Sequence, residues 1–241
     1  MAEPRWRRVL IKLSGEAFAG KLEFGFDLGV VKGIAADVAK VTRAGVEAAI
    51  VVGGGNILRG ALAASSGMDR VQADHIGMLA TVQNALALQD MLEQIGVPTR
   101  VQTAISMESV AEPFIRRRAI RHLEKGRVVI FAAGTGNPYF STDTAAVLRA
   151  LEVKAGAVLK ATNVDGIYDR DPHLHPDARR FTFLDYAYCI EHKLGVMDMT
   201  AFALCAENDL PIVVFSIEEE SSMHRVVFGE AVGTIVGRSE R

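Results

Sequence analysis

Three short apolar runs in this sequence each stop abruptly at small residues, and this recurrence constrains the fold more than any other feature. The runs cover residues 8–13, 46–52 and 127–131, and they lead into Ser14-Gly15, Gly53-Gly54-Gly55 and Gly134-Thr-Gly136. Short apolar, β-branched runs bounded by turn residues predict buried strands. In an open parallel sheet the loops that leave the strands gather at the carboxyl edge, where ligands usually bind. We therefore expect these small-residue loops to lie together.

Strand-like and helical segments alternate along the rest of the chain. Further strands are predicted at 99–103, 157–160, 181–183, 212–215 and 234–236, and Asp27, Asp185 and Asp198 are predicted to cap helices. Hydrophobic residues make up 49% and aromatic residues 7%, so the core consists mostly of small aliphatic side chains. The pattern predicts an α/β fold, a three-layer αβα sandwich with a mainly parallel central sheet. No linker or repeat is evident, so residues 1–241 are expected to form one domain.

The charge balance and the apolar pattern exclude several classes of function. Lys and Arg number 27 against 29 Asp and Glu, so no overall field attracts nucleic acid. A helix is predicted over residues 113–125, with arginines at 116, 117, 118 and 121. These arginines have no interleaved aromatic residues and are expected to form a solvated or intersubunit face. No apolar run approaches the roughly 20 residues that span a bilayer, and no secretory signal is apparent. With two cysteines and no metal-ligand spacing, we expect a cytoplasmic protein that binds neither nucleic acid nor membrane.

Two cations stand beside the first two small-residue loops. Lys12 lies inside an apolar run, where a lysine is costly unless its ammonium meets an anion or reaches solvent at the strand end. Arg59 follows the glycine triplet, which permits close approach of the backbone to a ligand, and it is either a phosphate contact or surface charge. Neither glycine loop matches a dinucleotide-binding fingerprint or a P-loop.

The pattern over residues 131–146 predicts the end of a strand, a glycine turn and a helix that begins with Thr142 and Asp143. Free N–H groups at such a helix start favour a bound anion, although an ordinary connection is an equal alternative. Residues 161–172, with Tyr168, form either a hairpin turn or a loop over a nucleotide.

A helix is predicted over residues 68–94, beginning near Asp69. Its middle is apolar nearly all round, which predicts that other subunits cover part of it. Asp74 in its first turns is either a helix-end charge or a ligand-binding carboxylate. We assign no role to His75.

Taken together, the loops, Lys12, Arg59 and Asp143 suit phosphoryl transfer, in which a protein positions two phosphate-bearing partners and neutralises charge. They do not suit acyl transfer, because no nucleophile elbow or catalytic triad is suggested.

Five blocks of this sequence resemble the bacterial UMP kinases of the amino acid kinase family. The blocks are Lys12-Leu-Ser-Gly15-Glu, Gly53-Gly-Gly-Asn56 with Arg59-Gly60, Asp74-His-Ile-Gly-Met-Leu-Ala-Thr81, Gly134-Thr-Gly-Asn-Pro-Tyr-Phe140-Ser-Thr-Asp143 and Lys160-Ala-Thr-Asn-Val-Asp-Gly166. The resemblance covers essentially the whole chain and implies the reaction ATP + UMP → ADP + UDP by direct in-line transfer. Magnesium would arrive with ATP, and no residue is assigned as a metal ligand.

The resemblance also implies roles for individual residues. Lys12, Arg59 and Asp143 would be catalytic, with Asp143 orienting lysines, for which Lys160 is a candidate, instead of acting as a base. The ATP site would comprise Lys12, Ser14, Gly15, Gly55, Arg59, Thr162, Asn163, Tyr168 and Asp171. The UMP site would comprise Gly54, Asp74, Thr135, Gly136, Asn137, Pro138, Tyr139, Phe140, Ser141 and Thr142. A homohexamer and GTP or UTP effectors are also implied, without assigned effector residues.

Two alternatives to a UMP kinase stay open at this point. One is another kinase of the family with a carboxylate or carbamate acceptor. The other is a nucleotide-binding storage or sensor protein on the same fold.

Overall fold

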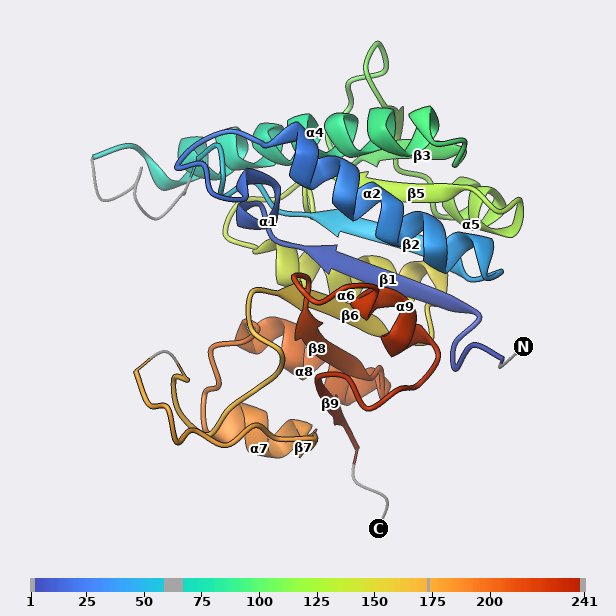
Figure 1. The fold of residues 1–241 in the computed structure, drawn as a ribbon. Coiled ribbons are helices and arrows are strands. Elements are labelled where there is room, and N and C mark those ends of the chain that lie inside the picture. The colour runs from blue at the N-terminus through green and yellow to red at the C-terminus, as the bar shows by residue number, and fades with distance from the viewer. Residues whose placement is uncertain (1–2, 59–66, 173, 239–241) are drawn as a thin grey trace.

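The sheet at the centre of this computed structural model is a single mixed sheet. The structure describes residues 3–58, 67–172 and 174–238. Within them its nine strands follow the order β4-β3-β5-β2-β1-β6-β8-β9-β7 (Figure 1). β9 is antiparallel to β8, whereas the other described neighbours pair in parallel. The strands are β1 (Arg8–Leu13), β2 (Glu47–Val52), β3 (Thr99–Thr103), β4 (Glu112–Pro113), β5 (Val128–Ala132), β6 (Val158–Thr162), β7 (Phe183–Asp185), β8 (Ile212–Ser216) and β9 (Thr234–Gly237).

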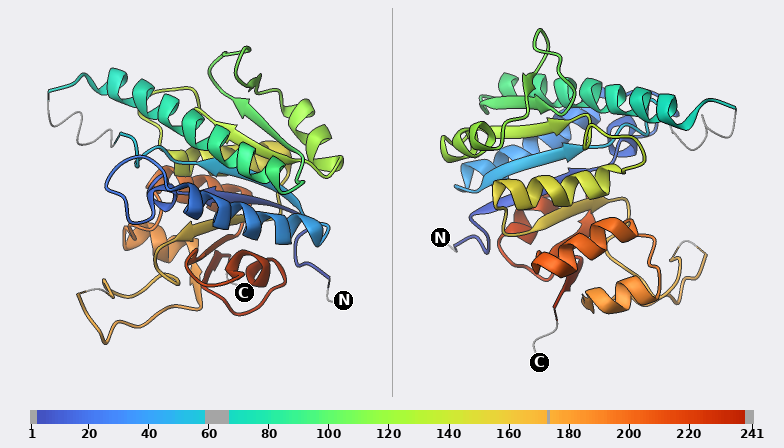
Figure 2. Two further views of the ribbon diagram at one scale, coloured as in Figure 1. Left: turned by 45° about the horizontal axis from the view of Figure 1, so that its top comes forward. Right: turned by 180° about the vertical axis from the view of Figure 1, so that it is seen from behind.

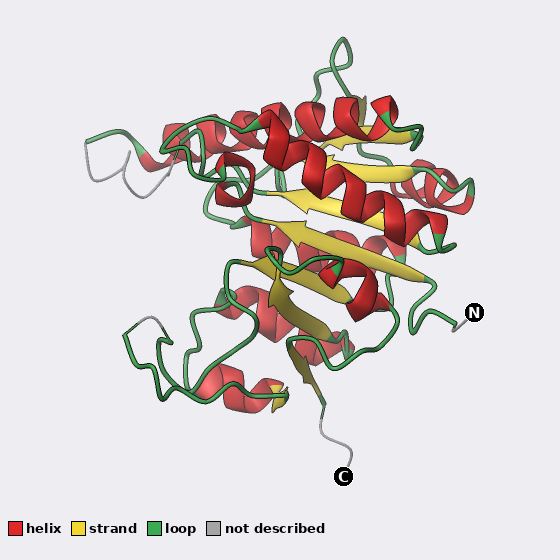
Figure 3. Ribbon diagram, in the orientation of Figure 1, coloured by secondary structure: helices red, strands yellow, loops and turns green. Residues whose placement is uncertain are grey.

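Helices cover both faces of this sheet, which confirms the predicted three-layer fold. One face carries α1 (Glu16–Ala19), α2 (Leu28–Arg43), α4 (Arg70–Gln94) and α9 (Ser222–Val227). The other face, seen from behind in Figure 2, carries α5 (Arg116–Glu124), α6 (Thr142–Val153), α7 (Tyr186–Glu191) and α8 (Met199–Asn208). Figure 3 shows loops gathered beyond the arrowheads of the central strands, which is the edge of the sheet where we expected the small-residue loops to lie.

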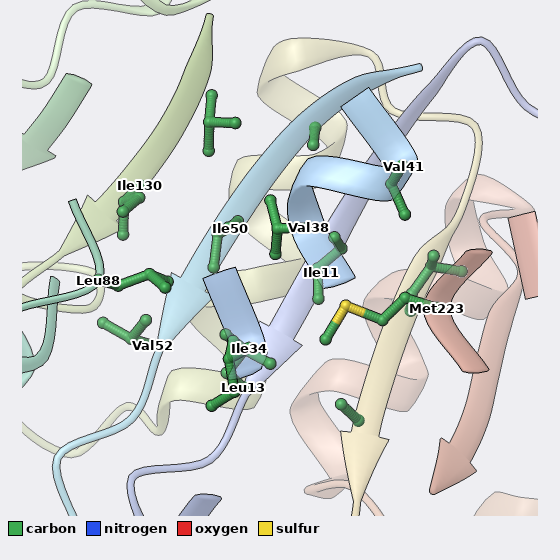
Figure 4. Packing of buried hydrophobic residues seen from close by; sticks show 14 of the residues in the cluster. Ile11, Leu13, Ile34, Val38, Val41, Ile50, Val52, Leu88, Ile130 and Met223 are labelled. Atoms are coloured by element: carbon green, nitrogen blue, oxygen red, sulfur yellow. The ribbon is translucent and has the colours of Figure 1, made fainter. Parts of the chain in front are cut away.

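The alternation of side chains along β1 decides on which face of the sheet each of its residues lies. Ile11 and Leu13 pack into the core on the α2 side of the sheet, with Ile50 and Val38 among their neighbours (Figure 4). Leu10 faces the core on the α6 side. Successive side chains of a strand point to opposite faces, so Lys12 shares the face of Leu10.

Most predicted helix starts are confirmed by their caps. The carboxylate of Asp27 accepts hydrogen bonds from the N–H groups of Gly29 and Val30, and Asp69 accepts one from Gln72. Asp185 and Asp198 cap α7 and α8 in the same way. Helix α6 begins at Thr142, as predicted, and its cap is the preceding residue, Ser141. The helix expected from residue 113 begins only at Arg116, because Pro113 belongs to β4.

Helix α4 is only partly buried within this chain. Ala73, Thr81 and Asn84 are buried, whereas Ile76 is 40% exposed and Leu79 is 48% exposed. An apolar stripe of the helix therefore faces outward from this chain. None of the helices in the described part of the chain has both the length and the apolar character to cross a bilayer.

Candidate functional site

Two lysines on neighbouring strands meet one carboxylate at the carboxyl edge of the sheet. Lys12 on β1 is directly opposite Lys160 on β6 in the strand register. Asp143, in the first turn of α6, lies between them: its Oδ1 is 2.8 Å from Lys12 Nζ, and its Oδ2 accepts a hydrogen bond of 2.7 Å from Lys160 Nζ. Lys160 Nζ also donates to the carbonyl of Val196. The structure thus places Asp143 against both Lys12 and Lys160, and its role in orienting them stays a prediction.

Burial and charge shape the acidity of this cluster. Burial alone would raise the pKa of the Asp143 carboxyl, but Lys12 and Lys160 outweigh that effect and hold the pKa below its ordinary value. Burial lowers the pKa of the Lys160 ammonium, and the charge of Lys12 adds to that lowering, against the opposing effect of Asp143. Two ammonium groups thus share one carboxylate, and an added anion would complete their neutralisation.

The first two small-residue loops pack backbone against backbone beside this cluster. A Cβ atom on Gly15 would lie 2.3 Å from the N atom of Gly55, and one on Gly54 would lie 2.7 Å from the carbonyl oxygen of Gly77 in α4. Real Cβ atoms do not approach so closely, so these positions require glycine. The predicted meeting of the loops after β1 and β2 is therefore confirmed.

A cleft of about 590 Å³ opens between the glycine loop, α4 and the start of α6. Gly54, Asp74, Phe140, Ser141 and Thr142 line it, and all five were predicted UMP contacts. Its volume lies within the range typical of small-molecule sites.

Asp74 and Thr81 tie α4 to the turn after β5. Asp74 Oδ2 accepts a 2.7 Å hydrogen bond from the N–H of Tyr139, and its carboxylate also receives the guanidinium of Arg70 at 2.9 Å. Thr81 Oγ1 accepts a 2.7 Å hydrogen bond from the N–H of Ala133. These bonds bring Asp74 to the turn that carries the remaining predicted UMP residues.

Five predicted UMP residues do not line the cleft. They are Thr135, Gly136, Asn137, Pro138 and Tyr139. Thr135 and Asn137 hydrogen-bond to one another within the turn, and Tyr139 is 68% exposed.

The predicted adenosine residues are only partly brought together. Asn163 lines a second cavity, of about 710 Å³, which runs along α2 and shares Glu16 with the first cleft. The Tyr168 hydroxyl instead donates to Asp165 Oδ1 at 2.5 Å, and Arg180 pairs with the same carboxylate at 2.6 Å. That hydrogen bond raises the pKa of Tyr168. Arg59 lies outside the described residues.

Asp198 is a residue of this site that sequence reasoning missed. Its carboxylate accepts hydrogen bonds from the hydroxyls of Ser141 and Thr144, at 3.0 and 3.1 Å for Thr144, while it caps α8. The cap was predicted, but no local signal showed that the same carboxylate would hold the first turn of α6.

A mainly parallel sheet whose carboxyl edge joins glycine loops to paired lysines defines an α/β protein built to hold phosphate-bearing ligands. More particularly, the chain belongs to the amino acid kinase family, whose family model matches residues 7–216.

Three solved structures are similar over nearly the whole chain. A UMP kinase from Bacillus anthracis is 40% identical, with a TM-score of 0.94, covering 98% of this chain and 97% of that one. A UMP kinase from Ureaplasma parvum is 36% identical, with a TM-score of 0.91 and coverages of 97% and 100%. A uridylate kinase from Archaeoglobus fulgidus is 26% identical, with a TM-score of 0.74 and coverages of 95% and 99%.

Proposed function

We propose that this protein is a UMP kinase that transfers the γ-phosphoryl group of ATP directly to UMP, giving UDP and ADP. The observation that carries the proposal is the Lys12–Asp143–Lys160 cluster, which stands beside a cleft of nucleotide size. The two bacterial UMP kinases that resemble this chain over nearly its full length support the choice of acceptor.

UMP occupies the cleft of about 590 Å³ in this proposal. Asp74 receives the ribose hydroxyls, since a carboxylate accepts two hydrogen bonds from a diol. The half-exposed Arg70 side chain, which now pairs with Asp74, can move into solvent. Phe140, Ser141 and Thr142 line this cleft, and the adjoining turn from Thr135 to Tyr139 would wrap UMP and supply N–H donors when UMP is bound.

Phosphoryl transfer in this site depends on how the reacting phosphates are positioned and how their charge is neutralised. Asp143 holds Lys12 and Lys160 beside the reacting phosphates, and its lowered pKa makes it a poor proton acceptor. No base is needed, because the UMP phosphate is already ionised. Lys12 neutralises the charge that develops on the transferred group.

The donor is ATP with its magnesium ion, which belongs to the substrate and is held chiefly by phosphates and water. Ser14, Gly15 and Gly55 face the phosphates, and Arg59 spans the two nucleotides. Thr162, Asn163, Tyr168 and Asp171 form the adenosine side. We further propose a cytoplasmic homohexamer, with the apolar stripe of α4 at a subunit interface, that responds to GTP or UTP.

A panel of acceptors tests the proposal. Purified protein with ATP and magnesium is offered UMP, CMP, dUMP, aspartate, acetylglutamate and carbamate, and ADP and phosphorylated products are measured. UMP should give the highest kcat/KM by a wide margin. Turnover of an amino acid or carbamate with UMP inert would identify another kinase of the family, and nucleotide binding without UDP formation would identify a sensor.

A further inference from the structure

A buried pair of asparagines joins the glycine loop to helix α4, and neither side chain lines the cleft of about 590 Å³. Asn84 is fully buried in the middle of α4, and Asn56, the residue after the glycine triplet, is 4% exposed. Their side-chain amides face one another: Asn56 Nδ2 donates to Asn84 Oδ1 at 3.0 Å, and Asn84 Nδ2 donates to Asn56 Oδ1 at 2.7 Å. A buried amide is costly without such partners.

The second hydrogen atom of each amide is also used. Asn84 Nδ2 donates to the carbonyl of Gly53 at 2.8 Å, and Asn56 Nδ2 donates to the carbonyl of Gly25 at 2.7 Å. Only an NH2 group can face a carbonyl oxygen, so these two backbone groups dictate the orientation of both amides. The main chain of Asn56 adds a bond, because its carbonyl accepts the N–H of Gly25 at 2.9 Å.

The pair therefore lies where three segments meet: α4, the glycine loop and the loop that contains Gly25. It also touches a fourth, the turn after β1, since a Cβ atom on Gly15 would lie 2.7 Å from Asn56 Oδ1. Gly15 and Gly55 are in direct backbone contact there. A shift of Asn56 would move the glycine loop relative to the turn that follows Lys12.

We propose that Asn84 is a positioning residue for phosphoryl transfer, acting through Asn56 to hold the glycine loop against the turn after β1. The inference rests on the proposed kinase function. Neither asparagine side chain lines the UMP cleft, so the pair acts on the alignment of the reacting groups and leaves the contacts of Asp74 intact. Misplacement of reacting groups by about 1 Å can slow a reaction about 100-fold.

The test is Asn84→Asp, which keeps the shape of the side chain and removes both donors. The new oxygen then faces the carbonyl of Gly53 and the amide oxygen of Asn56. An ionised carboxylate is repelled by both oxygens, and a protonated one can donate to only one of them. With saturating ATP, kcat should fall about 100-fold while KM for UMP changes by less than about threefold. Asn208→Asp is the matched control: Asn208 is exposed and donates to the carbonyl of Leu204 in its own helix, at 2.9 Å, so kcat and KM should not change.

Calorimetric titration with UMP separates positioning from simple loss of folded protein. Asn84→Asp should keep the wild-type stoichiometry while kcat falls. A stoichiometry that falls in step with kcat, or a kcat within twofold of the wild type, would overturn the proposal. Asn56→Asp is the second variant should Asn84→Asp not fold, and the same loss of kcat at unchanged stoichiometry is expected.

Hydrogen exchange keeps this inference distinct from the proposed reaction. If the wild type forms no UDP, the kinase proposal fails, and the pair is still tested by the exchange of amides at residues 53–56. Those amides should exchange faster in Asn84→Asp than in the wild type and the Asn208→Asp control. Unchanged exchange would refute the positioning role whatever the activity.

Discussion

Replacing Asp143 by Asn should destabilise the protein through the two lysines that share this carboxylate. The side chains of Lys12, Asp143 and Lys160 are 8%, 14% and 11% exposed, so their charges are poorly screened by solvent. Removing one partner from a buried ion pair typically costs 3–5 kcal/mol, and we take about 3 kcal/mol because some exposure remains. In a chain of this length, that loss corresponds to a decrease in Tm of about 6–12 °C.

The pH dependence of this effect follows from the pKa shifts. The pKa of Asp143 is lowered in the folded state, so its stabilisation is present above its unfolded pKa of about 3.9 and is lost as pH falls through the folded value. The pKa of Lys160 is also lowered, so stability rises with pH once the folded protein binds fewer protons than the unfolded chain. Without Asp143 the pKa of Lys160 falls further, because the carboxylate was opposing the effects of burial and of Lys12. The difference between wild type and variant should therefore be largest near neutral pH and should narrow toward pH 9.

The assay is thermal and urea unfolding at fixed protein concentration, from pH 5 to pH 9. Glu124→Gln is the control, because its ion pair with Arg121 is exposed and such pairs contribute about 0.5 kcal/mol or less. A loss below about 1 kcal/mol for Asp143→Asn, or a loss that is constant across this pH range, would refute the reasoning.

Three further substitutions test the proposed roles in catalysis. Lys12→Met should lower kcat by about 100-fold or more with little change in KM, measured by steady-state kinetics, and an unchanged kcat would mean that Lys12 does not serve the transferred group. Asp74→Asn should raise KM for UMP more than KM for ATP, because the lost contact is to ribose, and equal effects on both would contradict that assignment. Gly15→Ala should abolish activity and lower Tm, since its Cβ would lie 2.3 Å from Gly55 N; normal activity in this variant would show that the two loops are not packed as described.

Much of the fold could be predicted because it depends on local chemistry. Apolar runs bounded by glycine became β1, β2 and β5, and aspartates became the caps of α2, α4, α7 and α8. The details that the sequence did not supply were also local. Ser141 caps α6 because its hydroxyl reaches the N–H groups of Asp143 and Thr144, while Asp143 turns inward to the lysines. Pro113 pairs at the sheet edge, so the helix begins later than expected.

The sequence predicted individual residues of the candidate site better than the contacts between them. Lys12 and Asp143 stood out, one as a charge in an apolar strand and the other at a helix start after a glycine turn. The contacts of Asp198 with α6 and of Asn84 with Asn56 left no signal in the sequence. A helix-capping aspartate or a helical asparagine has the same local sequence pattern whether or not it makes such a distant contact. The contacts between Asp198 and Ser141, and between Asn56 and Asn84, join residues far apart in sequence.

The sequence by itself determined the alternation of strands and helices and the small-residue loops, since backbone preference and apolar periodicity act over a few neighbouring residues. Only the tertiary structure decided that Lys12 and Lys160 would share Asp143. That sharing depends on the register of β1 against β6 and on how α6 packs across both strands. Register and packing are set by the whole core at once, so no local stretch of the chain encodes them.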